Sequence, residues 1–294
     1  MRIMFLNQAP RDPNQSDAEV EAVQQLLASY ASPGTEIEVH FPEDYPGALV
    51  HKIQGRAQRT NGLHHAMEVP GLVRKAVWAA ENAFDAVIQS NTFDPGVEAS
   101  RLAVRIPVIG LLRTALHVGA NLADRIAVIT PLESDIPSCR RTIEAYRMGH
   151  VVAAMTSLEI YSDNLAARQA EIFDRACELI EGLKRDHGAQ CVLPLGGKLI
   201  PYVVDPNELA ARTEVPVLNT KAIGVRFAEL CVGLASAMPR PPIPIRVSRS
   251  RRSPREWAGA SDLAPQRIPP QGLRILRRLI SHEQVADELP KEQL

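Results

Sequence analysis

The sequence predicts an α/β fold made of two pseudo-symmetric halves, each a parallel sheet flanked by helices, and two observations support it. The first is a repeated layout: the apolar strand 86–89 runs into Ser90, strand 191–195 runs into Gly196 and Gly197, and each is followed by a further Pro-Val strand. The second is the alternation of strands with helices, which is typical of parallel sheets covered on both faces. Such a duplication predicts strand ends that face each other across a cleft, where open α/β sheets bind ligands.

Hydrophobic periodicity predicts each element of the first half. The first strand is apolar and ends at Asn7 and Gln8, and the helix after it carries apolar residues on one face. Asp94 followed by Pro95 predicts a helix start, with a side-chain cap and a proline in the first turn. The expected elements are strand 2–6, helix 17–31, strand 36–40, helix 71–83, strand 86–89, the helix from Asp94 and strand 106–109.

The second half repeats the alternation and ends with a helix that we expect to return to the first half. Its expected elements are helix 114–122, strand 126–130, a helix from Ser134 or Asp135 to 147, strand 151–155, helix 164–185, strand 191–195, strand 215–218 and helix 222–234. We therefore expect a first half of residues 1–112 with 217–237, a second half of residues 113–216, and a tail of residues 238–294.

The tail differs in composition from the rest of the chain, and the net charge of −1 for the whole sequence hides this asymmetry. From Pro239 onward it holds eleven Lys or Arg against six Asp or Glu, and nine of the 23 prolines. Proline removes hydrogen-bond donors and the arginines repel one another, so we expect a disordered extension with at most a short helix at 272–281. Its basic residues are not interleaved with aromatic ones, which argues against nucleic-acid binding.

The bulk composition excludes several classes of protein. The chain is 45% hydrophobic and 23% charged, its longest apolar runs have only strand length, and we expect no membrane segment and a cytoplasmic location. Its four cysteines show no C-x-x-C spacing, which argues against a zinc site or a disulfide framework. We also expect no metal and no cofactor, and the sequence leaves open whether the chain is a homo-oligomer.

Several segments in order resemble the aspartate/glutamate/hydantoin racemase superfamily, and more closely its hydantoin-racemase branch. The resemblance covers residues 1 to about 236 and excludes the tail. The matching segments are the first strand into Asn7, 85–88 into Asn91 and Thr92, 94–99, 106–110, 115–117, 125–130, Leu195-Gly196 with Pro201, and 216–218. The resemblance implies a fold of two α/β halves in which one cysteine from each half lies at the cleft and moves the proton next to a carbonyl group.

Both cysteine positions of that family are replaced here. The first falls on Ser90, or on Asn91 in an alternative alignment, and the second on Gly197, with Lys198 next to it. A thiol can be tuned to a thiolate near neutral pH, whereas a serine hydroxyl cannot act as a base without a neighbouring base. Two-thiol racemisation is therefore not expected.

The candidate site residues follow from their places at strand ends. Ser90, Asn91 and Lys198 are the candidate catalytic residues, because polar groups there could stabilise an enolate oxygen and a lysine could bind a carboxylate or act as a base. The candidate substrate-binding residues are Asn7, Gln8, Thr92, Thr130, Ser134, Gly196 and Gly197. For each of them a plain turn or helix cap is the alternative interpretation, and capping by Ser134 is the safer one.

Three histidines and one cysteine complete the candidates. His64 and His65 lie in an expected loop before a helix, and either could supply the proton-transfer group that the thiols would otherwise provide. His117 is more simply a structural residue of a helix face, and Cys139 is expected to be packed.

These residues predict an enzyme that acts next to a carbonyl group of a small carboxylate or cyclic amide, by lyase, decarboxylase or hydrolase-like chemistry. A hydantoin or amino-acid racemase that uses other groups, and an inactive small-molecule-binding protein, are the alternatives. We expect no nucleic-acid and no membrane partner.

Overall fold

The structure is a computed structural model that describes residues 1–12, 15–43, 63–160, 165–196 and 199–237. The described residues all belong to one compact unit. Three predictions lie outside the described residues: those on the tail with its helix at 272–281, on Gly197 and on Lys198.

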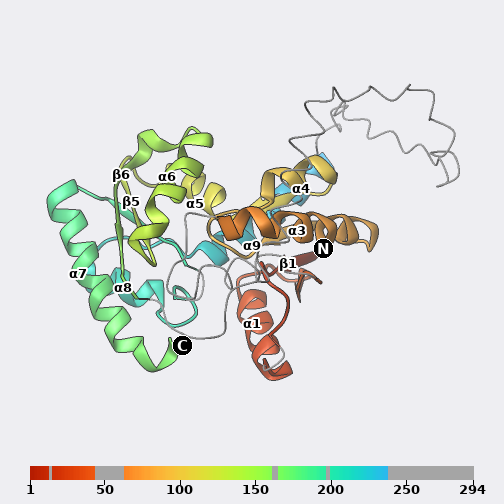
Figure 1. The fold of residues 1–294 in the computed structure, drawn as a ribbon, viewed down its shortest axis with the longest axis horizontal. Helices are drawn as coiled ribbons and strands as arrows, with labels where there is room; N and C mark the ends of the chain where they lie inside the picture. The colour runs from red at the N-terminus through yellow and green to blue at the C-terminus, as the bar shows by residue number, and fades with distance from the viewer. Residues whose placement is uncertain (13–14, 44–62, 161–164, 197–198, 238–294) are drawn as a thin grey trace, which may run out of the picture. The chain divides into compact units, whose positions relative to one another are not determined.

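A parallel four-stranded sheet in the order β2-β1-β3-β4 forms the first part of the fold. Its first strand, β1, is labelled beside the N-terminus in Figure 1. Its strands are β1 (Arg2–Leu6), β2 (Glu36–His40), β3 (Ala86–Gln89) and β4 (Val108–Gly110). In the pairing of β1 with β3, Leu6 lies opposite Gln89, and in the pairing of β3 with β4, Gln89 lies opposite Gly110. The carboxyl ends of the three strands are therefore level, and the residues that follow them start from one edge of the sheet.

Helices cover both faces of this sheet because successive residues of each strand point to opposite sides. Ile3 and Phe5 pack against α1 (Asp17–Ser29) and α9 (Thr220–Ala237), whereas Met4 and Leu6 pack against α3 (Leu63–Glu81) and α4 (Val97–Ala103). The last helix packs on this sheet: Val225 and Ala228 of α9 belong to its core, and Phe227 packs against it.

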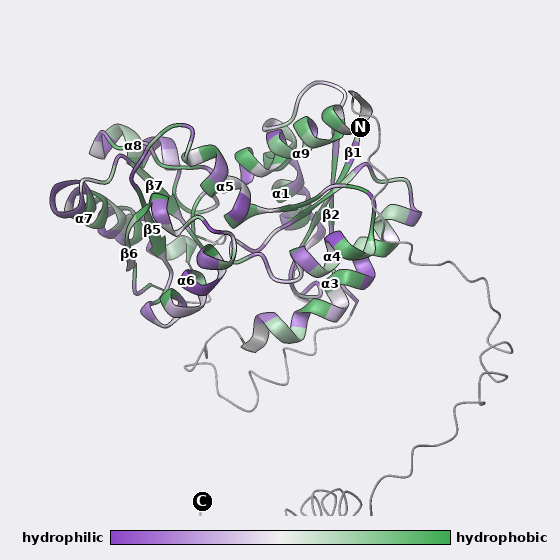
Figure 2. Ribbon diagram, turned by 90° about the horizontal axis from the view of Figure 1, so that it is seen from above, coloured by the Kyte–Doolittle hydropathy of each residue, from purple (hydrophilic) through white to green (hydrophobic). Residues whose placement is uncertain are grey.

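A parallel three-stranded sheet in the order β6-β5-β7 forms the second part. Its strands are β5 (Ile126–Thr130), β6 (Val152–Ser157) and β7 (Cys191–Pro194). One face packs against α7 (Gln169–His187) and α8 (Pro206–Thr213), and the other against α5 (Leu111–Gly119) and α6 (Ile136–Ala145). Hydropathy follows this layering: strands are coloured mainly hydrophobic, while α7 carries both hydrophilic and hydrophobic residues (Figure 2). The α/β fold with helix-covered parallel sheets is thus as predicted.

Several predicted boundaries are wrong. The helix expected from Gly71 begins at Leu63 instead and continues through Pro70, which is exposed. His64 and His65 therefore lie on a helix and not in a loop. The expected strand 215–218 is reduced to one bridge between Val217 and Val192.

The other shifts are smaller: short 3₁₀ turns at Glu133–Asp135, Gly149–Val151 and Ala166–Arg168 precede α6, β6 and α7, and α5 begins three residues earlier than predicted. Helix α8 is an additional element. Within the part of the chain that is described, no helix has both the length and the apolar character needed to cross a membrane.

Candidate functional site

The level carboxyl ends of β1 and β3 bring four of the predicted site residues to one edge of the sheet. Asn7 and Gln8 follow β1, and Ser90 and Asn91 follow β3. The Ser90 N–H donates to the Leu6 carbonyl at 2.9 Å, and the Asn7 N–H donates to the His40 carbonyl at 2.8 Å. These bonds continue the sheet pairing by one residue, so that the main chain of each polar residue is held by the strand before it.

A directional hydrogen-bond network joins these residues to α3. The Asn91 amide nitrogen donates to Gln8 Oε1 and lies 3.2 Å from His65 Nε2, and Gln8 Nε2 lies 3.3 Å from the carboxylate oxygen Oε1 of Glu68. The Asn91 amide oxygen accepts the Phe93 N–H at 2.9 Å, which fixes the orientation of the amide. His65 Nε2 consequently accepts from Asn91, and the proton of a neutral ring lies on Nδ1. The network thus orients His65, which also packs against the Phe93 ring with centroids 5.3 Å apart.

Ser90 is the residue of this edge whose side chain is left for a ligand. Its main-chain N–H and carbonyl are both bonded, whereas its half-buried hydroxyl makes no hydrogen bond to any residue that the structure describes. By contrast, Asn91 uses its amide oxygen and its amide nitrogen within the protein. The geometry therefore divides the roles of the two: Asn91 positions its neighbours, and Ser90 presents a donor.

Thr92 connects this edge to the second sheet. Its side chain is 1% exposed, and its Oγ1 accepts the Gly196 N–H at 2.7 Å, directly after β7. The N–H of Gly196, a predicted substrate-binding residue, is thus bonded inside the protein. Residues 199–203 form turns, and α8 begins at Pro206. Gly196 has φ +81°, and a Cβ there would overlap Pro131, so this turn requires glycine.

Thr92→Val is expected to lower the free energy of unfolding by about 1–3 kcal/mol, because it leaves the Gly196 N–H without its acceptor while keeping the volume of the side chain. Urea titration at pH 7 measures this change. Thr92→Ser keeps the hydroxyl oxygen and is the matched control, expected to lose less. A loss in Thr92→Ser together with an unchanged stability in Thr92→Val would show that packing and not the hydrogen bond is what matters at this position.

Lys221 is a functional candidate that the sequence prediction missed. It is the second residue of α9, it is 1% exposed, and its Nζ donates to the Ser90 carbonyl at 2.5 Å. Two aromatic rings also lie near it, with Nζ 5.2 Å from the Phe5 ring centroid and 5.7 Å from that of Tyr202. Burial lowers the pKa of Lys221 to about 7, and the charge of Asp94 partly opposes this shift. Among the described residues no carboxylate pairs with it.

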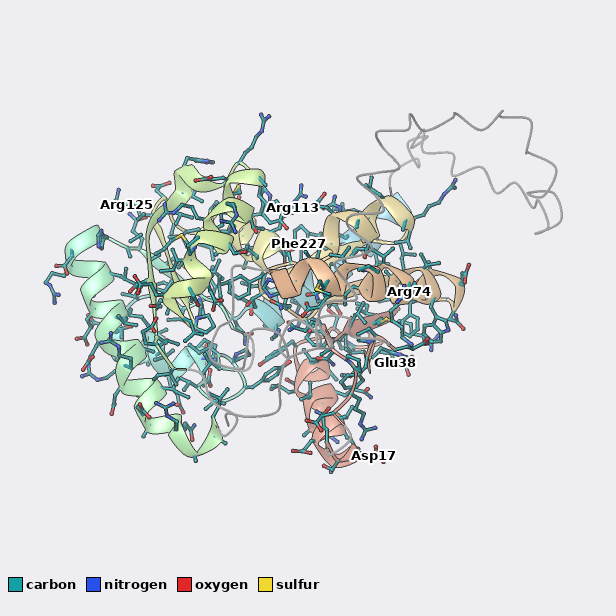
Figure 3. All side chains as sticks on the ribbon, viewed as in Figure 1. Asp17, Glu38, Arg74, Arg113, Arg125 and Phe227 are labelled. Atoms are coloured by element: carbon teal, nitrogen blue, oxygen red, sulfur yellow. The ribbon has the colours of Figure 1, made fainter. Side chains whose placement is uncertain are left out.

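Asp94 does not cap its own helix as predicted. Its φ of +56° takes its main chain out of a helix start, and α4 begins instead after Gly96. The buried carboxylate accepts the Leu112 and Arg113 N–H groups, both at 2.9 Å, and the Tyr146 hydroxyl at 3.1 Å. It therefore caps α5, at whose start Arg113 lies (Figure 3). Burial raises the pKa of Asp94 to about 6, against the effect of these bonds.

The remaining predicted residues have no hydrogen bond to the network among the described residues. Thr130 is fully buried and its hydroxyl lies 2.9 Å from the Leu132 carbonyl and 3.2 Å from that of Thr156. Ser134 is exposed and does not cap α6, because the residue at the cap is Asp135, which makes no side-chain capping bond. His117 is exposed on α5. The His64 side chain lies outside the described residues.

The four cysteines are not poised for catalysis at neutral pH. Burial is the main cause that raises the pKa of each thiol, to about 12 for Cys139 and about 11 for Cys191, and upward for Cys177 and Cys231. Cys139 is fully buried in the core, as predicted. In the described part of the chain, no three His, Cys, Asp or Glu side chains are gathered so that they could hold a metal ion.

Comparison with known proteins agrees with the resemblance. The family model described as Asp/Glu/Hydantoin racemase matches residues 12–228. A hydantoin racemase of Rhizobium meliloti is 25% identical over 212 residues, which cover 72% of this chain and 82% of that protein.

Two solved structures show the same fold. An allantoin racemase from Pseudomonas fluorescens has a TM-score of 0.66 and 22% identity, over 82% of this chain and 98% of that one. Arylmalonate decarboxylase has a TM-score of 0.53 and 16% identity, over 79% of this chain and 93% of that one. With a family model that spans more than two thirds of its length, the chain belongs to the Asp/Glu/hydantoin racemase family.

Proposed function

We propose that this family member is an enzyme that acts next to a carbonyl group of a small carboxylate or cyclic amide, and that it does so without a pair of thiols. The observation that carries the proposal is the polar edge formed by Ser90, Asn91, Gln8 and His65 at the carboxyl ends of β1 and β3. Ligands of open α/β sheets bind at such strand ends. The raised pKa values of all four thiols support a reaction that does not use thiolates.

One-sided chemistry suits this arrangement. In a decarboxylation, the bond from the α-carbon to the leaving carboxylate breaks, carbon dioxide departs, and the electron pair passes to the neighbouring carbonyl oxygen. The Ser90 hydroxyl is the proposed donor to that oxygen, and a proton then returns to the α-carbon. His65, oriented by Asn91, is the proposed group that transfers this proton. Arylmalonate decarboxylase, which shares the fold, carries a name that denotes this class of reaction.

A substrate panel tests the proposal. Purified protein is incubated with hydantoins, amino acids and arylmalonates while optical rotation and carbon dioxide release are recorded, with exchange of the α-hydrogen followed in heavy water. We expect turnover of at least one compound, and a loss of about 10²- to 10⁴-fold in kcat for His65→Asn. Asn91→Ala is expected to lower kcat less, since it only releases the orientation of His65.

The other outcomes identify the alternatives. Racemisation with deuterium exchange would indicate a racemase that uses other groups, and a further loss in Cys139→Ser would contradict the structural role of Cys139. Ligand-induced thermal stabilisation without any product would indicate a binding protein and overturn the proposal. His117→Asn is the matched control, because His117 is exposed on α5 and is expected to leave kcat unchanged.

A further inference from the structure

Lys221 lies directly behind the proposed site and has no role in the chemistry described so far. Its Nζ is bonded to the main-chain carbonyl of Ser90, whose hydroxyl is the donor left for a ligand. The ammonium group is therefore bonded to the main chain of the residue whose side chain is left for the ligand. Protein atoms exclude water from the ammonium group, since only 1% of Lys221 is exposed. In such surroundings a charge acts over a longer distance than it does in water.

The charge of Lys221 is only weakly balanced by its surroundings. Phe5 of β1 and Tyr202 in the segment after β7 present aromatic rings to it, and the pKa of the Tyr202 hydroxyl is raised by burial, so that Tyr202 is neutral near pH 7. Asp94 acts on Lys221 only through its field, because its carboxylate is held by the Leu112 and Arg113 N–H groups and the Tyr146 hydroxyl. A buried ammonium without a close carboxylate is costly unless an anion joins it.

Two neighbouring polar groups could each make a further hydrogen bond. Gln89 Nε2 lies one residue before Ser90, and Thr220 Oγ1 one residue before Lys221, and both are buried without a hydrogen-bond partner among the residues that the structure describes. Buried donors are normally bonded, and those that are not call for an explanation. The bond from Lys221 to Ser90 brings the start of α9 against the end of β3, and Asn219 Oδ1 caps that start by accepting the Lys221 and Ala222 N–H groups.

We propose that Lys221 is the positioning cation of the site, which selects ligands with a carboxylate by acting through the Ser90 main chain and is stabilised by the anion in return. This inference rests on the proposed function, since it names the charge that the ligand must carry. Because the folded protein holds Lys221 with a pKa of about 7, anion binding draws a proton onto it above that pH.

Carboxylate affinity should therefore fall with rising pH while affinity for an uncharged ligand does not. The probes are phenylacetate and hydantoin, titrated calorimetrically into the full chain between pH 6.5 and 8.5. If only the protonated lysine supports binding, the Kd of phenylacetate rises about 25-fold over this range, with proton uptake visible in buffers of different ionisation enthalpy. Hydantoin binding is expected to stay nearly constant.

Variants separate Lys221 from the other titrating groups. Lys221→Met should weaken phenylacetate at pH 6.5 by on the order of tenfold to a hundredfold and abolish the pH dependence. Lys221→Arg, whose charge is constant, should keep binding without pH dependence. His65→Asn should retain the pH dependence, which excludes the imidazole as its source, and Asp94 titrates below this range.

The inference is overturned if phenylacetate binds the unmodified protein with a pH-independent Kd, or if folded Lys221→Met binds it as tightly at pH 6.5. In either case the proposed function is not overturned, because it is tested by turnover in the substrate panel and not by the pH dependence of binding. If neither phenylacetate nor hydantoin binds and no compound of the substrate panel is turned over, the proposed function is overturned as well. Circular dichroism and a urea transition establish that each variant is folded before it is titrated.

Discussion

Lys221→Met is expected to make the protein more stable near neutral pH, by about 2–4 kcal/mol in the free energy of unfolding. Methionine matches the unbranched stem of lysine and fits the contacts with Phe5 and Tyr202, but it leaves no charge in a site that is 1% exposed. The bond from Lys221 to the Ser90 carbonyl is lost, and the removal of a desolvated ammonium outweighs that loss. If the charge of Lys221 is retained for function at the expense of stability, then replacing it should stabilise the protein.

The pH dependence of this effect has a definite sign. The pKa of Lys221 is about 7 in the folded protein, against an ordinary value of 10.5. Between these two values the unfolded chain binds more protons, so the free energy of unfolding of the unmodified protein rises as pH increases from about 7 to 10.5. Below pH 7 the lysine is charged in both states and the full destabilisation is present. The difference between Lys221→Met and the unmodified protein is therefore largest at pH 6.5 and shrinks toward pH 9.5.

Urea unfolding at pH 6.5 and 9.5 measures both the gain and its decline. Lys184→Met is the matched control: Lys184 is exposed on α7 and forms a surface pair with Glu214 at 3.8 Å, so its loss should change stability by less than about 0.5 kcal/mol at either pH. A loss of stability in Lys221→Met at pH 6.5 would show that the bond to the Ser90 carbonyl outweighs the desolvation of the charge.

The dipeptide Asp-Pro, a local signal for a helix start, explains one wrong prediction, the helix from Asp94, and one helix that was not predicted, α8. Asp94-Pro95 and Asp205-Pro206 both have the composition of a helix start. At Asp205 the side chain does cap its own helix, accepting the Asn207 N–H at 2.8 Å, and α8 was nevertheless overlooked because it is short and polar. The Asp94 carboxylate instead accepts hydrogen bonds from the first N–H groups of α5, which follows β4 in the chain. A local pattern contains no information on such a distant partner.

The site shows the same division between local and distant information. Asn7, Gln8, Ser90 and Asn91 could be predicted because apolar strands end at them and parallel strands end at one edge. Lys221 could not be predicted as a site residue, because the apolar pattern of α9 is recognisable only from Ala222 onward. In addition, a lysine at the start of a helix is ordinarily exposed. Its burial depends on Phe5, Ser90 and Tyr202, which are distant in the sequence and come together only through the topology.

Asp94→Ala is expected to cause the largest loss of stability, on the order of 3–5 kcal/mol, because it leaves three donors without their shared acceptor. Two of them, the Leu112 and Arg113 N–H groups, are at the start of α5, and the third is the Tyr146 hydroxyl after α6. Gly110 lies against the carboxylate and has no side chain that could replace it as acceptor. The loss is measured by urea unfolding at pH 7.

Asp94→Asn separates the hydrogen bonds from the charge. One amide oxygen still accepts, but the amide nitrogen must face a donor, so an intermediate loss of about 1–3 kcal/mol is expected at pH 7. The pKa of Asp94 is raised to about 6 from 3.8, so the folded state binds more protons between these values and stability falls as pH rises through this window. The neutral amide should remove that slope.

Asp94→Asn is also expected to change the pKa of Lys221. The charge of Asp94 raises the pKa of Lys221, so Asp94→Asn should lower it and move the midpoint of the pH dependence of phenylacetate binding below that of the unmodified protein. Asp94→Asn therefore predicts two separate shifts, a flatter stability profile below pH 6 and a lower midpoint of ligand binding near pH 7. An unchanged binding midpoint in a folded Asp94→Asn protein would mean that the field of Asp94 does not reach the ammonium group, and that Lys221 keeps its proton through the Ser90 carbonyl alone.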